Sequence, residues 1–170
     1  MNLQEYTYRI LPTKDKLYRF ALRTTGNTAE SEDIVQEVFL RIWEQRTSLK
    51  NLENPDAWCM RMVKNLAIDK LRAKRKQNVA LDTELQTADR QVNPHQQAEI
   101  DDTIRHIEIF IQRLPEKQRM VIQMRDIEGM TYKEIAFVLD IPIDQVKVNL
   151  HRARKQVRKQ LISAESFGVT

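Results

Sequence analysis

Apolar residues recur every three or four positions along most of the chain, the spacing that places them on one side of an α-helix. The β-branched residues follow this helical spacing rather than the alternation expected of a half-buried strand. Only three glycines occur among 170 residues. The pattern therefore predicts an all-α fold.

The first predicted helix follows Pro12 and ends near Gly26, a residue that readily adopts left-handed backbone at a helix terminus. Asn27, with Glu30 three residues later, predicts the N-terminal cap of the next helix. The inward residues of the first helix are predicted to be Leu17, Phe20, Ala21 and Thr24.

The next helix contains the segment DIVQEVFLRIW, residues 33–43, whose apolar residues form one broad stripe. We expect this stripe to face the core: Ile34, Val35, Val38, Phe39, Ile42 and Trp43. The opposite side is polar except for one central leucine, which suggests a partner, and its members are Asp33, Gln36, Glu37, Leu40, Arg41 and Glu44.

Residues 47–56 predict a loop and a helix start, because Asn54 is a good cap and Pro55 suits the first helical position. We expect this helix to run to about Lys76 and to bury Trp58, Met62, Val63 and Leu66. Another face gathers basic residues around an asparagine, as is typical of contact with nucleic acid: Arg61, Lys64, Asn65, Arg72 and Arg75.

Residues 77–97 are polar, acidic and aperiodic, and they predict a flexible linker between two small helical domains. We place the first domain at 1–77, the linker at 78–98 and the second domain at 99–170.

The second domain begins with a long predicted helix that ends at Pro115 and a following helix that ends at Gly129. The first of them places on one side Ile100, Ile104, Ile107, Ile111 and Leu114. The second is expected to turn inward Val121, Ile122, Met124 and Ile127.

The segment TYKEIAFVLDIPIDQVKVNLHRARKQV, residues 131–157, contains two helical patterns around a short break. Thr131 and Glu134 match a capping box and start a short helix. The turn is Asp140–Pro142, since proline is tolerated in the first turn of a new helix but not inside a continuing one. The short helix is predicted to bury Ile135, Ala136 and Leu139, and the second Val146, Leu150, Ala153, Val157 and Leu161.

One side of this second helix carries side chains suited to DNA. Gln and Asn can pair with adenine, Val can contact a thymine methyl, and Arg or Lys can bind guanine or phosphate. We therefore predict a helix-turn-helix with its second helix in the major groove, the alternative being an ordinary helical hairpin with a basic side. The predicted contact residues are Gln145, Lys147, Val148, Asn149, Arg152 and Lys155.

The net charge of +4 is unevenly distributed. Residues 61–76 hold seven basic side chains and one acidic, and residues 147–159 hold six basic and none acidic. Residues 78–104 instead hold six acidic side chains and one basic. Two separate basic segments indicate a polyanion that is contacted twice, although each alone would also fit the solvated side of a surface helix.

Composition excludes several kinds of protein. Cys59 is the single cysteine, so no internal disulfide forms, and we expect it to be a small core residue in a reducing cytosol. The sequence lacks a basic leader and any apolar run of about 20 residues, which predicts a soluble, cytoplasmic protein. No metal, other cofactor or small-molecule substrate is predicted, since no two of His95, His106 and His151 have metal-ligand spacing.

Two other functions fit part of the sequence. A stand-alone helix-turn-helix regulator explains residues 131–157 equally well, but it leaves the first domain without a role. A nuclease would need acidic and histidine side chains that converge in a motif, and no motif supplies them.

Three segments in this order resemble the bacterial RNA polymerase sigma factors of the extracytoplasmic-function class, over roughly residues 10–162. DIVQEVFLRIW is similar to the region-two helix that grips the clamp coiled coil of RNA polymerase. NPDAWCMRMVKNLAIDKLRAKRK is similar to the segment that melts the promoter and reads its minus-ten element. Region four, which reads the minus-thirty-five element, is resembled by RLPEKQRMVIQMRDIEGMTYKEIAFVLDIPIDQVKVNLHRARKQVRKQL.

The resemblance implies a non-enzymatic subunit that binds core RNA polymerase and directs it to promoter DNA. Polymerase would be bound by Asp33, Gln36, Glu37, Leu40 and Arg41. A flipped minus-ten base would be held by Ser48, Lys50, Asn51 and Asn65, and its capture would offset part of the cost of opening the duplex. The phosphates nearby would be bound by Arg61, Lys64, Arg72 and Arg75.

The helix-turn-helix departs from the usual pattern of that family. Asp140 stands where glycine is common, Pro142 and Val148 where serine is, and Asn149 where arginine is frequent, so no promoter sequence can be carried over. Members of the family are commonly held inactive by an anti-sigma factor, often a membrane protein, and the resemblance implies such a partner. The acidic linker would run through the polymerase near the path of nascent RNA.

Overall fold

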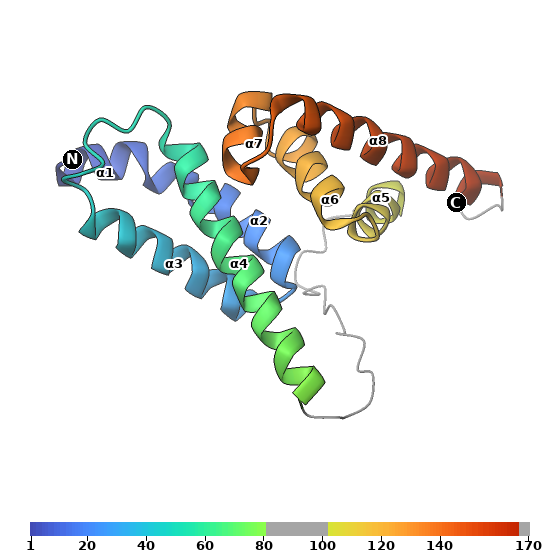
Figure 1. The fold of residues 1–170 in the computed structure, drawn as a ribbon, viewed down its shortest axis with the longest axis horizontal. Coiled ribbons are helices and arrows are strands. Elements are labelled where there is room, and N and C mark those ends of the chain that lie inside the picture. Colours follow the sequence, from blue (N-terminus) through green and yellow to red (C-terminus); the bar gives the residue numbers. More distant parts are fainter. Residues whose placement is uncertain (81–101, 167–170) are drawn as a thin grey trace. The chain divides into compact units, whose positions relative to one another are not determined.

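The computed structural model describes residues 1–80 and 102–166, which form helices and connecting turns without a β-strand. The predicted all-α class is thus confirmed. The chain divides into two compact units, Met1–Val92 and Asn93–Thr170 (Figure 1). Residues 81–98 of the predicted linker lie outside the described residues.

The first unit contains, within its described residues, α1 (Leu3–Arg9), the 3-10 helix η1 (Leu11–Thr13), α2 (Lys14–Thr25), α3 (Thr28–Glu44) and α4 (Pro55–Ala80). α2 packs against both α3 and α4, and α3 also contacts α4, so these three helices enclose the core. The largest contributions to this core come from Leu17, Phe20, Ile34, Val38, Ile42, Met60 and Val63.

α2 ends and α3 begins where the sequence predicts. Gly26 has a φ of 67° and donates its N–H to Leu22 O at 2.8 Å, which closes α2. The Asn27 side chain accepts the N–H of Glu30 at 2.9 Å and caps α3. The predicted inward residues of α2 are all buried: Leu17, Phe20, Ala21 and Thr24.

α1 is a helix that the sequence analysis did not predict, and it covers one edge of α3. The Tyr6 ring packs edge-on against Phe39 and Trp43, with centroid distances of 6.5 and 5.3 Å. Its hydroxyl donates to Phe39 O at 2.9 Å. Phe39 and Trp43 are half-buried, whereas the rest of the predicted α3 stripe is fully buried: Ile34, Val35, Val38 and Ile42.

The predicted buried side of α4 was wrong in part, because Trp58, Met62 and Leu66 are only half-buried. Val63 is buried as predicted, and the other residues of α4 in the core are Ala57, Cys59, Met60 and Ala67. The small side chains of Ala57, Cys59 and Ala67 let neighbouring helices approach closely, and such residues give a weaker apolar signal than half-buried Trp58 and Met62. α4 also extends to Ala80, one turn beyond the predicted end, since residues 77–80 contain no helix breaker.

The second unit contains, within its described residues, α5 (Asp102–Gln112), α6 (Glu116–Ile122), the π-helix η2 (Gln123–Ile127), α7 (Tyr132–Leu139) and α8 (Ile143–Ser166). α8 packs against α5, α6 and α7, so one helix contributes to the whole core of this unit. In α5 the prediction held only near the C-terminal end, where Ile111 is buried, as is Leu114 just beyond the helix. Ile104 is 51% exposed, and Ile100 lies outside the described residues.

η2 interrupts the regular helical spacing that the sequence analysis assumed. The Glu128 N–H donates to Gln123 O, five residues earlier, at 3.0 Å. Val121, Ile122 and Met124 are buried as predicted, whereas Ile127, at the end of this wider turn, is 37% exposed. Gly129 ends the segment with a φ of 70°, as predicted.

Candidate nucleic-acid interface

The short helix before the candidate recognition helix begins with the predicted capping box. Thr131 N donates to Glu134 Oε2 at 2.6 Å, and Glu134 N donates to Thr131 Oγ1 at 3.2 Å. α7 buries Ile135 and Val138, whereas Ala136 and Leu139, which were predicted to be buried, are half-buried.

The turn between α7 and α8 depends on one residue with left-handed backbone. Asp140 has a φ of 55° and a ψ of 50°, a conformation in which Asp is tolerated better than most residues other than Gly. Glycine would adopt this conformation at lower cost, and Asp is the kind of residue that can replace it there. Pro142 O then accepts the N–H groups of Gln145 at 3.0 Å and Val146 at 3.2 Å, which starts α8.

α8 combines a buried stripe with an exposed polar face. Val146, Leu150, Ala153 and Val157 are buried as predicted, and Leu161 is half-buried. Five predicted contact residues are exposed: Gln145, Lys147, Val148, Arg152 and Lys155. The sixth, Asn149, is half-buried and donates Nδ2 to Gln145 O at 2.8 Å, which uses one of its two amide hydrogens.

One cation of the basic α8 segment, Arg154, pairs with an acidic residue of the same unit. Arg154 donates Nε and a terminal nitrogen to the two carboxylate oxygens of Asp126 in η2, at 2.9 and 2.6 Å. This hydrogen-bonded carboxylate raises the pKa of the Arg154 guanidinium. Sequence reasoning missed this role, because Asp126 lies 28 residues away and no local pattern links the two.

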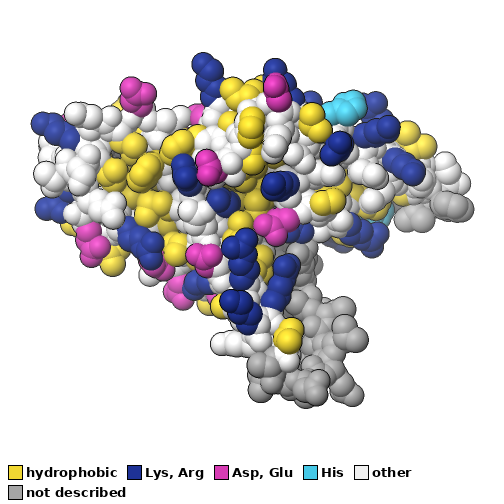
Figure 2. All heavy atoms as spheres, in the orientation of Figure 1, with side chains coloured by type: hydrophobic (Ala, Val, Ile, Leu, Met, Phe, Trp, Pro, Cys, Tyr) yellow, Lys and Arg dark blue, Asp and Glu magenta, His cyan; other side chains and the backbone are white. Residues whose placement is uncertain are grey.

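The second candidate surface comprises the loop before α4 and one face of that helix. Ser48, Lys50 and Asn51 are exposed on the loop, and Asn54 accepts the Ala57 N–H at 3.0 Å as the predicted cap of α4. Along α4 the predicted contact residues Asn65, Arg72 and Arg75 are exposed, and Arg61 and Lys64 are half-buried. Figure 2 shows Lys and Arg side chains gathered over the C-terminal half of α4 and along α8.

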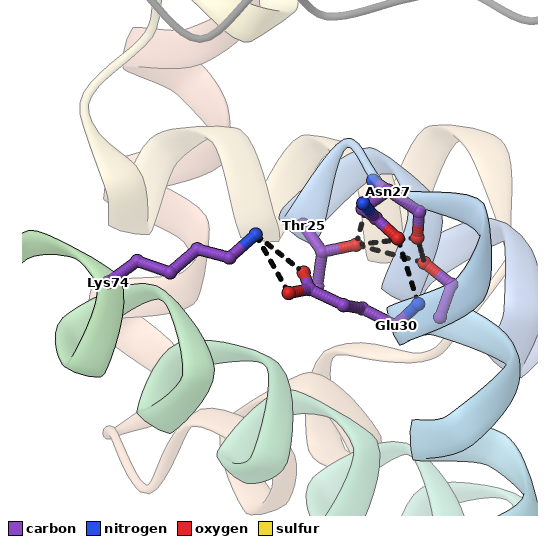
Figure 3. Close-up of polar contacts among 5 residues, drawn as sticks. Thr25, Asn27, Glu30 and Lys74 are labelled. Atoms are coloured by element: carbon purple, nitrogen blue, oxygen red, sulfur yellow. Dashed lines mark hydrogen bonds and ion pairs between the residues drawn. The ribbon is translucent and has the colours of Figure 1, made fainter.

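Lys74 of α4 is held by an acidic residue of α3 (Figure 3). Its Nζ lies 2.8 Å from each carboxylate oxygen of Glu30. Glu30 is itself placed by the Asn27 cap, and the Asn27 N–H donates to Thr25 Oγ1 at 3.2 Å. The pair ties the exposed end of α4 to the start of α3, and it partly neutralises one cation of the basic face.

The candidate polymerase surface is the outward face of α3. Asp33, Gln36 and Arg41 are exposed, and half-buried Glu37 forms an ion pair with Arg41 one turn away. Leu40, at the centre of this face, is 57% exposed. An apolar side chain ringed by polar groups is typical of the centre of a protein interface.

Cys59, the remaining candidate for reactive chemistry, is a buried core residue. Cys59 is fully buried, and this burial raises its pKa to about 12, so the thiol stays protonated and inert at neutral pH. The described residues contain no group of three or more His, Cys, Asp or Glu side chains placed to hold a metal ion. None of the helices described is long and apolar enough to cross a membrane.

Comparison with protein families finds two matches, one within each unit. Residues 10–77 match sigma-70 region 2, and residues 107–157 match sigma-70 region 4.

Curated proteins are similar over most of this chain. The ECF RNA polymerase sigma factor SigW of Bacillus subtilis is 34% identical over 159 residues, covering 87% of this chain and 84% of SigW. The ECF RNA polymerase sigma factor SigL of Mycobacterium tuberculosis is 33% identical over 156 residues, covering 91% of this chain and 85% of SigL.

Solved structures share the fold at lower sequence identity. The sigma factor RpoE of Bartonella quintana, solved with the anti-sigma factor NepR, has a TM-score of 0.77 at 20% identity, covering 94% of this chain and 98% of RpoE. CnrH, solved with the cytosolic domain of CnrY, has a TM-score of 0.60 at 21% identity, covering 94% of this chain and 90% of CnrH.

Proposed function

Because the chain belongs to the extracytoplasmic-function (ECF) family of RNA polymerase sigma factors, we propose that its two units read different elements of one promoter. The chain is a promoter-recognising sigma factor for transcription initiation and contributes binding rather than catalysis. The observation that carries the proposal is that each family match falls within one unit and contains one exposed basic helix face.

In the second domain, proposed to span 99–170, α8 enters the major groove of the minus-thirty-five element. Exposed Gln145, Val148 and Arg152 reach base edges, together with half-buried Asn149. Lys147 and Lys155 bind phosphates at the groove margin. The buried stripe of α8 supports this role, because it fixes which side of the helix faces the DNA.

In the first domain, proposed to span 1–77, the loop before α4 receives an unstacked minus-ten base. Ser48, Lys50 and Asn51 are exposed there, and Asn65 joins them from the helix. Polar groups that hydrogen-bond a flipped base return part of the cost of unstacking, so recognition and melting are coupled. The adjoining phosphates are bound by Arg61, Lys64, Arg72 and Arg75.

The outward face of α3 binds core RNA polymerase. Leu40 supplies an exposed apolar centre, and charged and amide groups surround it. Contact residues are Asp33, Gln36, Glu37, Leu40 and Arg41. The linker proposed at 78–98, whose first three residues complete α4, joins the two promoter-binding domains across the polymerase.

Regulation by an anti-sigma factor completes the proposal. The fold relative RpoE was solved with the anti-sigma factor NepR, and CnrH was solved with the cytosolic domain of CnrY. We infer a comparable partner here, working in the cytoplasm, where polymerase and promoter DNA are found.

The test is transcription in vitro with core RNA polymerase across a random promoter library. Arg152→Ala should relax selection within the minus-thirty-five element, and Asn65→Ala should relax it within the minus-ten element. Loss of one good base contact corresponds to about 1–3 kcal/mol of discrimination. Arg158→Ala is the matched control, because Arg158 is also an exposed cation of α8 but outside the proposed reading face.

Initiation at selected promoters, with each substitution altering its own element, supports the proposal. Equal relaxation of both elements by either substitution contradicts the division of reading between the domains. DNA binding without initiation on any core enzyme contradicts the assignment of α3 to polymerase and favours a stand-alone regulator.

A further inference from the structure

The N-terminal segment, residues 1–9, precedes the region 2 match, so the family likeness assigns it no role. It is nevertheless an ordered helix with a complete capping box. Glu5 N donates to Asn2 Oδ1 at 2.8 Å, and Asn2 N donates to Glu5 Oε2 at 3.0 Å. A reciprocal cap holds the start of a helix that is too short to be stable alone.

Two donors of this segment bind the loop between α3 and α4. The Arg9 guanidinium donates to Leu52 O, 43 residues away in sequence. The Met1 nitrogen donates to Arg46 O at 3.1 Å, 45 residues away. These two carbonyls flank the part of the loop that carries Ser48, Lys50 and Asn51.

α1 is in turn fixed to α3, so it can transmit rigidity to the loop. Tyr6 is 9% exposed, donates its hydroxyl to Phe39 O at 2.9 Å and packs edge-on against Trp43. Arg46, at the start of the loop, stacks over the Trp43 ring at 4.4 Å and donates to Trp43 O at 2.9 Å. The loop ends are therefore attached to the helical core through α1 and Trp43.

We propose that α1, acting through Arg9, is a positioning element for the minus-ten pocket. A pocket for an unstacked base discriminates best when its polar groups are already in place, because ordering a mobile loop on binding costs conformational entropy. Arg9 restrains the loop at Leu52, next to Asn51. This inference rests on the proposed role of Ser48, Lys50 and Asn51.

The experiment compares Arg9→Ala with the full-length protein on the promoter that the full-length protein selects. Templates carry single substitutions in the minus-ten or the minus-thirty-five element, and the readout is the ratio of initiation on selected and substituted templates. Arg9→Ala should lower the minus-ten ratio about tenfold or more, the size expected from the lower end of the range for loss of a charge-assisted hydrogen bond. The minus-thirty-five ratio and the affinity for core polymerase should stay unchanged.

Two variants separate positioning from charge and from folding. Lys14→Ala removes an exposed cation five residues further on and should leave the minus-ten ratio intact. Arg9→Lys keeps a cationic donor and should recover part of the ratio. Amide hydrogen exchange of residues 47–52 should accelerate in Arg9→Ala, while exchange in α2 stays slow.

The possible results separate this inference from the proposed function. If the unaltered protein does not initiate with core polymerase, the proposed function fails. If it initiates with minus-ten selection that Arg9→Ala leaves intact, or if both ratios fall equally, only the role of α1 is overturned.

Discussion

α4 and α8 are the two longest helices of the described chain, one in each unit, and both join a buried side to a basic face. α8 buries Val146, Leu150, Ala153 and Val157 at regular spacing, and its proposed reading residues lie on the same length of helix. Over residues 55–79, α4 buries side chains only in its first half, between Ala57 and Ala67, and residues 72–79 are exposed on every side. The proposed minus-ten pocket therefore depends on a loop before α4, whereas the proposed minus-thirty-five reading depends on α8 alone.

This difference bears on how each surface is kept rigid. The side chains of α8 that face DNA are placed by the helix itself, and the Asp126–Arg154 pair resists rotation of that helix. The loop before α4 has short turns of its own and is attached to the core by donors from α1. A helix face needs no such brace, because its backbone hydrogen bonds are satisfied within the helix.

The largest expected effect comes from removing a buried side chain of α8. Leu150 is 2% exposed, so Leu150→Ala should lower the free energy of unfolding of the second unit by about 2–5 kcal/mol. Circular dichroism during denaturation measures the loss. Ile162→Ala is the control, since Ile162 is 57% exposed, and a similar loss there would contradict the assigned core side of α8.

In α4, enlarging a buried side chain should destabilise the first unit. Ala67 is fully buried, so Ala67→Leu should overpack the contact of α4 with its neighbours and cost about 1–3 kcal/mol. Both tryptophans, Trp43 and Trp58, lie in the first unit, so tryptophan fluorescence reports its unfolding separately. Ala73→Leu on the exposed part of α4 should have little effect. If Ala67→Leu and Ala73→Leu lowered the stability equally, α4 would not be tightly packed around Ala67.

Cys59 should make the first unit sensitive to alkaline pH. Burial raises the pKa of Cys59 from 9.0 to about 12, so between these values the unfolded thiol loses its proton while the folded thiol keeps it. Stability is fully present below pH 9 and should fall by about 1–2 kcal/mol by pH 10.5. Denaturation at pH 8 and pH 10.5 measures the fall, and Cys59→Ala should lessen it. An identical pH dependence in Cys59→Ala would exclude this cause.

The smallest effects should come from releasing the paired cations. Glu30→Gln leaves Lys74 without its carboxylate partner, and Asp126→Asn does the same for Arg154. If the freed cation of α4 reaches a phosphate, the slope of log affinity against log salt should steepen by about one. Arg154 faces η2 rather than the DNA, so its release should leave the slope unchanged. The affinity for non-specific duplex DNA, measured across salt concentrations, tests both variants. An unchanged slope in Glu30→Gln would show that Lys74 lies away from the phosphates.

Local signals predicted most of the helices and the buried face of α8. The Gly26 terminus, the Asn27 cap and the Thr131–Glu134 capping box each depend on residues within four positions, and all three were confirmed. The α8 stripe was predicted for the same reason, because an uninterrupted helix keeps its spacing. The prediction for Ile127 was wrong because one π-turn shifts every later residue around the axis.

The sequence by itself determined where most helices start and stop, which side of α8 is buried and where positive charge accumulates, because these features arise from near neighbours along the chain. Tertiary structure alone decided the partners of Arg9, Lys74 and Arg154, which lie 43, 44 and 28 residues away. It also decided that Ala57, Cys59, Met60 and Ala67 join Val63 on the buried side of α4. Such contacts depend on how closely distant helices approach, and side-chain volume, hydrogen-bond geometry and charge select that approach only when the chain is folded.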